Sequence, residues 1–132
     1  MVNYRQLSVA TAFGLGCAVI AIVVGIYIGV GIAHPWLYKV VHVAAGFSLA
    51  MFFSSFGLSY LGVCVGVFGV SAFWEFFEYL LTLPGVLSAF HALLPWYGVP
   101  QVSYEGLLLD YVRNFFGVAL FYLFRFLGST DR

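Results

Sequence analysis

Charge is scarce in this sequence. Five basic and five acidic residues make up 8% of the 132 residues, whereas about 25% is usual in a soluble domain. So few charges cannot cover a soluble surface, and a disordered chain would be far less apolar. The formal net charge of +0 leaves no basic face for nucleic acid. The composition therefore excludes a soluble globular domain, a disordered chain and a nucleic-acid-binding protein.

Cysteine is scarce as well. The two cysteines, Cys17 and Cys64, lie inside long apolar runs and form no C-x-x-C motif. A thiol redox relay usually needs such a pair, so we expect both residues to be buried free thiols.

Apolar residues dominate instead. They make up 64% of the chain, and the mean hydropathy is +1.06. This composition is typical of an integral membrane protein whose apolar side chains face lipid. We expect an all-α fold, in which residues 1–132 form one membrane domain with four transmembrane helices in an antiparallel bundle. The expected spans are residues 7–33, 37–56, 61–83 and 102–127.

The first apolar run, residues 7–33, carries no charge. As a helix it would rise roughly 40 Å, enough to cross a hydrocarbon core of roughly 30 Å with some tilt. A cleaved signal peptide is the alternative. We favour a retained helix, because the apolar core of a signal peptide has only about 7–15 residues.

The segment 84–101 separates the third and fourth spans. It is bounded by Pro84 and Pro100, interrupted by Pro95, and has no formal charge. A soluble loop would be more polar, so we expect an interfacial segment or a lid over the bundle, with a short helix at Val86–Leu94.

Four spans place both termini on the same side of the membrane. Arg5, Arg125 and Arg132 flank the termini, whereas Lys39 lies near the opposite loops. The excess of positive charge predicts that both termini are cytoplasmic and that the protein resides in the cell membrane.

Two G-x-x-x-G motifs predict close helix packing. They begin at Gly25 and Gly62, and small residues at this spacing let helices approach. We favour packing within the chain, although a homo-oligomer or a complex with other membrane subunits is an open alternative.

Ionisable residues within the spans are few, and they occur at one level. His42 lies in the second span, Glu75 and Glu78 in the third, and Asp110 in the fourth. Counted at 1.5 Å per residue, all four lie roughly 7–12 Å below the outer helix ends. Asn114 follows Asp110 by one turn on the same face. Because isolated charges are costly in lipid, we expect these side chains to face one another, a metal or water.

Several chemistries fit this group. A divalent cation such as Mg²⁺, Mn²⁺, Fe²⁺ or Zn²⁺ suits imidazole, carboxylate and amide ligands. Metal-free acid–base catalysis is a second interpretation, because two close carboxyls cannot both ionise easily and one would keep its proton. A structural network with Arg113 and Lys39 as counter-ions is a third, and an ion or solute pathway is a fourth. The candidate catalytic residues are His42, Glu75, Glu78 and Asp110, and the candidate metal ligands are these four together with Asn114.

The order of these elements resembles a known family. The chain contains His42-x-x-x-Gly46-Phe47, then Trp74-Glu75-x-x-Glu78, then Asp110-x-x-x-Asn114-x-x-Gly117. This pattern, over about Leu37–Leu127, resembles the VanZ-like and YjdF-like small multi-span membrane proteins. The resemblance implies a role in the cell envelope or with lipids, because the family is associated with resistance to glycopeptide antibiotics.

We therefore expect a protein that binds or acts on a lipid or envelope-related molecule at the outer leaflet. Glu75, Glu78 and Asp110 would serve as ligands or bases, His42 as a ligand or proton carrier, and Asn114 as an orienting amide. A non-catalytic subunit of a larger membrane complex and a small ion or solute transporter are the alternatives.

Overall fold

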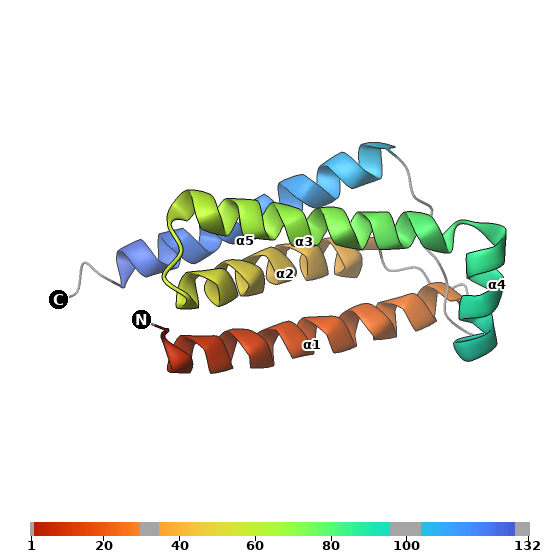
Figure 1. Ribbon diagram of the computed structural model, residues 1–132, viewed down its shortest axis with the longest axis horizontal. Coiled ribbons are helices and arrows are strands. Elements are labelled where there is room, and N and C mark those ends of the chain that lie inside the picture. Colours follow the sequence, from red (N-terminus) through yellow and green to blue (C-terminus); the bar gives the residue numbers. More distant parts are fainter. Residues whose placement is uncertain (1, 30–34, 96–103, 129–132) are drawn as a thin grey trace.

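The computed structural model describes residues 2–29, 35–95 and 104–128. All regular secondary structure in these ranges is helical, which confirms the expected all-α class. The helices are α1 (Tyr4–Gly29), α2 (Pro35–Ser55), α3 (Tyr60–Leu81), α4 (Pro84–Leu93) and α5 (Tyr104–Leu127) (Figure 1).

Local sequence explains where several helices begin. Pro35 and Pro84 occupy first turns, where a missing N–H is tolerated. Gly57 adopts a positive φ of 76° in the turn before α3, a conformation that glycine allows at low cost. Ser59 then caps α3, because its Oγ accepts a hydrogen bond from the Gly62 N–H at 3.2 Å.

The observed limits lie close to the expected ones. The first helix begins at Tyr4, three residues before the expected start, and the third ends at Leu81. The short helix expected within residues 84–101 is present as α4. Residues 30–33 and 102–103 of the expected spans lie outside the described part of the chain.

The four long helices run alternately up and down, and α2 is central. α2 packs against α1, α3 and α5, and α4 lies across one end of the bundle (Figure 1). The first turn of α1 and the last turn of α5 lie at the opposite end. There the Gln6 side-chain amide donates to the Met51 carbonyl at 2.9 Å, which ties α1 to α2.

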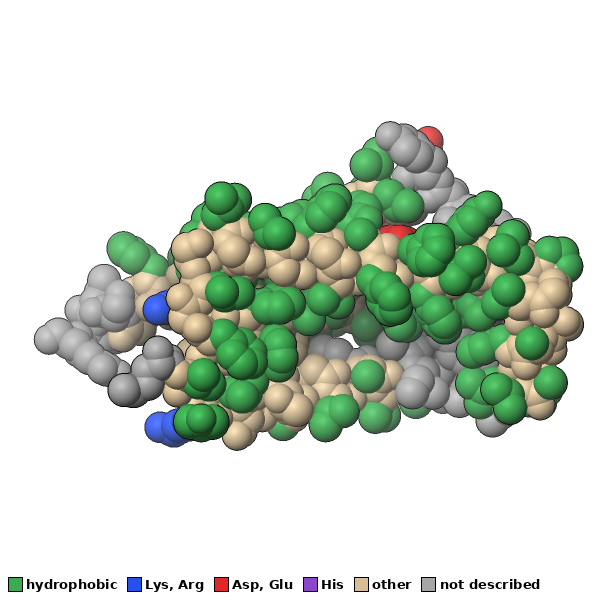
Figure 2. All heavy atoms as spheres, viewed as in Figure 1, with side chains coloured by type: hydrophobic (Ala, Val, Ile, Leu, Met, Phe, Trp, Pro, Cys, Tyr) green, Lys and Arg blue, Asp and Glu red, His purple; other side chains and the backbone are tan. Residues whose placement is uncertain are grey.

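The outside of the bundle is apolar and its interior contains polar groups. Among the described residues, Phe73, Val65 and Phe124 are each more than 60% exposed, whereas Glu75 and Asn114 are 5–6% exposed. Apolar side chains cover most of the face in Figure 2. In the part of the chain that was searched, Tyr60–Leu81 and Glu105–Leu127 are each long and apolar enough to cross a membrane.

Glycine brings α2 and α5 into direct backbone contact. A Cβ atom added to Gly46 would lie 2.0 Å from the Asn114 carbonyl oxygen, and one added to Gly117 would lie 2.1 Å from the Val43 carbonyl oxygen. Neither neighbour is a movable side-chain end. This crossing therefore requires glycine at both positions.

The predicted G-x-x-x-G motifs contribute less to helix contact. A Cβ atom on Gly66 would meet the Phe53 ring at 2.8 Å, so this glycine accommodates an aromatic side chain of α2. Gly62 faces only side chains of the residues just before it. The surroundings of Gly25 and Gly29 lie outside the described part of the structure.

Alanine at Gly46 or Gly117 should force α2 and α5 apart. We expect each substitution to lower the free energy of unfolding by about 2–3 kcal/mol, as overpacking does. Gly69→Ala on α3 is the matched control, because nothing lies within 4 Å of its added Cβ atom. Unfolding in mixed detergent micelles measures all three variants. Equal stability would show that this crossing does not need glycine.

Candidate functional site

Three helices bring a histidine and two carboxylates together. His42 of α2, Glu75 of α3 and Asp110 of α5 each offer a ligand atom, and these atoms lie within 4.8 Å of one another. Each residue is 6% exposed. The shared depth inferred from the sequence thus corresponds to proximity in space.

Asp110 lies between two basic side chains. Arg113, one turn later on α5, donates from Nη1 to Asp110 Oδ1. The His42 Nε2 atom lies 3.6 Å from Asp110 Oδ2, which is too far for a good hydrogen bond. The carboxylate therefore forms a firm ion pair on one side and only faces the imidazole on the other.

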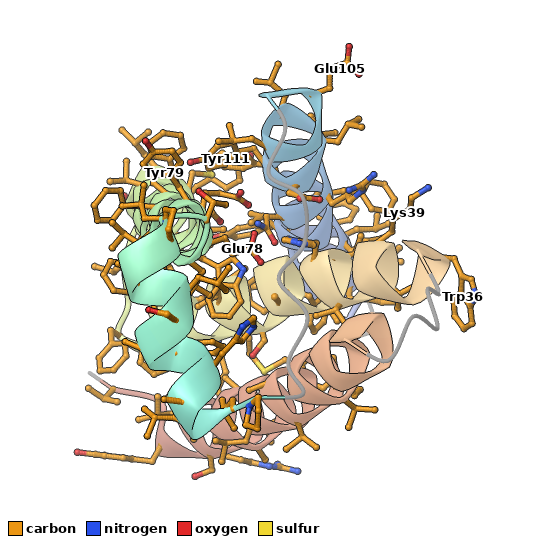
Figure 3. All side chains as sticks on the ribbon, turned by 90° about the vertical axis from the view of Figure 1, so that its right-hand side faces the viewer. Trp36, Lys39, Glu78, Tyr79, Glu105 and Tyr111 are labelled. Atoms are coloured by element: carbon orange, nitrogen blue, oxygen red, sulfur yellow. The ribbon has the colours of Figure 1, made fainter. Side chains whose placement is uncertain are left out.

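Glu78 is the second acidic neighbour of Glu75. Its Oε1 atom accepts a hydrogen bond from the Trp74 indole Nε1 at 3.0 Å, one turn earlier on α3. In Figure 3 Glu78 points from α3 towards the other helices, whereas Lys39 and Glu105 point outward. Lys39 is exposed, so the proposed counter-ion role falls to Arg113.

Asn114 links α5 to α3. Its Nδ2 atom donates to Ser71 Oγ at 3.0 Å, and the Ser71 hydroxyl donates to the Val67 carbonyl at 2.8 Å. Because Ser71 already uses its proton, it can only accept from Asn114, which fixes the amide orientation. The Asn114 Oδ1 atom is then a buried acceptor with no partner among the described residues.

These residues form one polar cluster: His42, Glu75, Glu78, Asp110, Arg113 and Asn114. Three carboxyls and one guanidinium leave an excess of two negative charges when the carboxyls are ionised and the imidazole is neutral. A buried charge without compensation costs several kcal/mol. Two protons or one divalent cation would remove the excess.

The cluster geometry is close to that of a metal site. Two ligands of one ion lie at most about 4.2 Å apart for Zn²⁺ or Mg²⁺, twice the bond length. The ligand atoms of His42, Glu75 and Asp110 lie up to 4.8 Å apart, which exceeds this distance by roughly half an ångström. Rotation of the side chains can supply a shift of that size. The 3.6 Å between His42 Nε2 and Asp110 Oδ2 is near the roughly 3.4 Å expected of adjacent ligands on a tetrahedral ion.

Some site residues were not apparent from the sequence. The hydrogen bond from Trp74 to Glu78 was missed, although their i, i+4 spacing is a usable signal. Ser71 is not among the candidate residues that the sequence indicates. Of the two other histidines, His91 lies in the last turn of α4, and His34 lies outside the described residues.

Arg113→Gln should destabilise the protein by about 3 kcal/mol, because it leaves the Asp110 carboxylate buried without its counter-ion. The double variant Asp110→Asn/Arg113→Gln should recover more than half of this loss. Arg125→Gln is the control, since Arg125 donates to Ser54 Oγ at an exposed position. Unfolding titrations in chelator-treated detergent give the double-mutant cycle. A double variant no more stable than the single one would contradict a dominant Asp110–Arg113 pair.

Comparison with models of known protein families, with curated proteins and with solved structures gave no match. The VanZ-like resemblance therefore stays a prediction that rests on its short motifs. The function has to be argued from the chemistry of the site itself.

Proposed function

We propose that this chain is a four-span membrane protein with cytoplasmic termini and a divalent-cation site in its outer half. Two kinds of observation support the membrane assignment. The exposed surface is apolar while the polar cluster is buried, and the four long helices alternate in direction (Figure 1). Arg5 and Arg125 belong to the end remote from α4, which agrees with the positive-inside rule.

The proximity of His42, Glu75 and Asp110 carries the metal proposal. Their ligand atoms come from three helices, lie within 4.8 Å and are shielded from solvent. Mixed nitrogen and oxygen ligands suit Zn²⁺, Mn²⁺ or Fe²⁺, and the carboxylates also suit Mg²⁺. Such a cation would neutralise the excess negative charge of the polar cluster. It would also act as a Lewis acid towards a carbonyl or phosphoryl oxygen.

The remaining cluster residues would support these three ligands. Arg113 orients the Asp110 carboxylate, and Trp74 orients Glu78. Glu78 and Asn114 are then placed to assist as outer ligands or as groups that position a bound molecule. We propose that this molecule is a lipid or an envelope-related compound that enters from the outer leaflet, with α4 as an interfacial segment at that end.

Cysteine labelling tests the four-span topology. Cys17 and Cys64 are first replaced by alanine, and a single cysteine is then placed at Ser59 or Ser88. We expect an impermeant maleimide to label Ser59→Cys from the cytoplasmic side and Ser88→Cys from the outside. These positions precede α3 and lie on α4, at opposite ends of the bundle. Labelling of both from one side would contradict the topology.

Metal analysis tests the site. Purified protein is stripped with a chelator, reloaded separately with Mg²⁺, Mn²⁺, Fe²⁺ or Zn²⁺, and analysed by plasma mass spectrometry. We expect about one equivalent of one of these ions, with affinity at least tenfold lower in Glu75→Gln and Asp110→Asn. Glu105→Gln, an exposed carboxyl at the start of α5, should retain full binding.

Two results would overturn the metal proposal. One is the absence of bound metal after reloading of the folded parent protein. The other is unchanged binding in folded Glu75→Gln and Asp110→Asn. Either result would identify the polar cluster as a network balanced by protons and by Arg113.

A further inference from the structure

A cavity of about 240 Å³ adjoins the polar cluster. Its polar end is formed by His42, Ser71 and Asn114. Ser48 and small or apolar residues form the rest, including Gly14 and Ala18 of α1, Ala45 and Leu49 of α2, and Val70 and Trp74 of α3. Three of the four long helices thus supply its apolar wall.

The cavity continues along α2 towards the cytoplasmic end. A second hollow of about 270 Å³ shares Gly14, Ser48 and Leu49 with the first and extends to Phe52. From His42 to Phe52, α2 rises about 15 Å. The combined space is therefore elongated, with His42, Ser71 and Asn114 at one end. The hydroxyls of Ser48 and Thr11, further along, each donate to a backbone carbonyl of α1.

The cavity lies between α1 and α3, beside α2. α1 and α3 both pack against α2, and in the described ranges they do not contact each other. Figure 2 shows the surface hollowed between α1 and α3. In a membrane this opening faces the lipid chains, so an apolar molecule can enter from the bilayer.

We propose that this cavity binds a single-chain lipid that carries a hydroxyl group at its head. A cavity of about 150 Å³ already holds benzene, so the larger and longer space suits an alkyl or isoprenoid chain. The described lining includes no Asp, Glu, Lys or Arg, which favours an uncharged head. One chain suits a cavity of about 240 Å³ better than the two chains of a phospholipid.

Asn114 supplies the second argument for a hydroxyl. Its amide nitrogen is held by Ser71, and its oxygen is a buried acceptor that receives no hydrogen bond from the described residues. A buried acceptor that lacks a hydrogen bond destabilises the folded state. A hydroxyl at the polar end of the cavity would donate to Asn114 Oδ1 after a small rotation of the amide.

This lipid site rests on the proposed function, because it requires the protein to lie in a membrane. A lipid with a hydroxyl head is then the substrate class of the polar cluster. His42 belongs to both the cavity wall and the polar cluster. A lipid hydroxyl bound at Asn114 would therefore lie beside the group that we assign to the cation. Binding itself needs no cation, so it can be tested in its absence.

Quenching of Trp74 fluorescence measures occupancy directly, because the indole lines the cavity. Trp36 and Trp96 are replaced by phenylalanine, and the protein is kept in detergent with a chelator. The probes are a long-chain alcohol with a terminal bromine and the bromoalkane of the same length. We expect saturable quenching by the alcohol, reversed by the same alcohol without bromine.

Two variants separate the head contact from the chain contact. Asn114→Leu should weaken alcohol binding about five- to tenfold, the effect of one hydrogen bond, and should leave bromoalkane binding equal or stronger. Ala45→Leu should remove saturable quenching by both probes, because it fills the cavity wall. Retained circular dichroism and a monodisperse elution profile establish folding of each variant.

Three outcomes would overturn the inference. Quenching that is not saturable would show that the cavity holds only water or detergent. Quenching that survives Ala45→Leu would come from probe in the micelle. If Asn114→Leu weakened the binding of both probes equally, Asn114 would not contact the hydroxyl group. Because the protein contains no metal in these measurements, they test lipid binding separately from the metal proposal. Failure of one proposal can therefore be distinguished from failure of the other.

Discussion

The backbone contact between α2 and α5 is the constraint on which the site depends. Gly46 and Gly117 let the two helices touch, since a side chain at either position would collide with a backbone carbonyl of the other helix. His42 precedes Gly46 by one turn, and Asn114 precedes Gly117 by about one turn. The close crossing therefore brings the imidazole of α2 opposite Asp110 and Asn114 of α5. α3 then needs only to pack beside α2 for Glu75 to complete the group.

The distribution of polar and apolar side chains determines which groups of the bundle are costly to bury. Exposed phenylalanine and leucine surround an interior in which carboxyls are buried, the reverse of a protein stabilised by burial from water. In lipid the apolar surface costs nothing, but each buried carboxylate needs compensation. Arg113 forms an ion pair with one of these carboxyls, that of Asp110. A purely structural network would be more stable with fewer carboxyls, since buried ion pairs are often no better than apolar packing. The divalent cation that we propose would balance the surplus of acidic groups.

Much of the fold and half of the site could be predicted from the sequence, for identifiable reasons. Helix number and limits follow from apolar runs and from Pro35, Gly57 and Pro84. The shared level of His42, Glu75 and Asp110 follows from the constant rise of a helix. The cavity could not be predicted, because beyond Thr11 α1 is apolar on every face and its sequence does not show which side meets α2. The orientation of the Asn114 amide was equally hidden, since it depends on Ser71, a residue of another helix.

The polar cluster contains the charged side chains of the interior, whereas the described lining of the cavity is uncharged. His42 belongs to both. Beside the imidazole lie Glu75 and Asp110, the two carboxyls of the proposed cation site. Ser71 and Asn114 instead offer neutral hydrogen-bonding groups to an apolar space. A neutral lipid head can occupy that space without disturbing the charge balance of the carboxyls. A cation held by the carboxyls would then lie one side chain away from the oxygen of that head. An amide and hydroxyls, with no carboxyl among the described lining residues, therefore suit the neutral head that we propose.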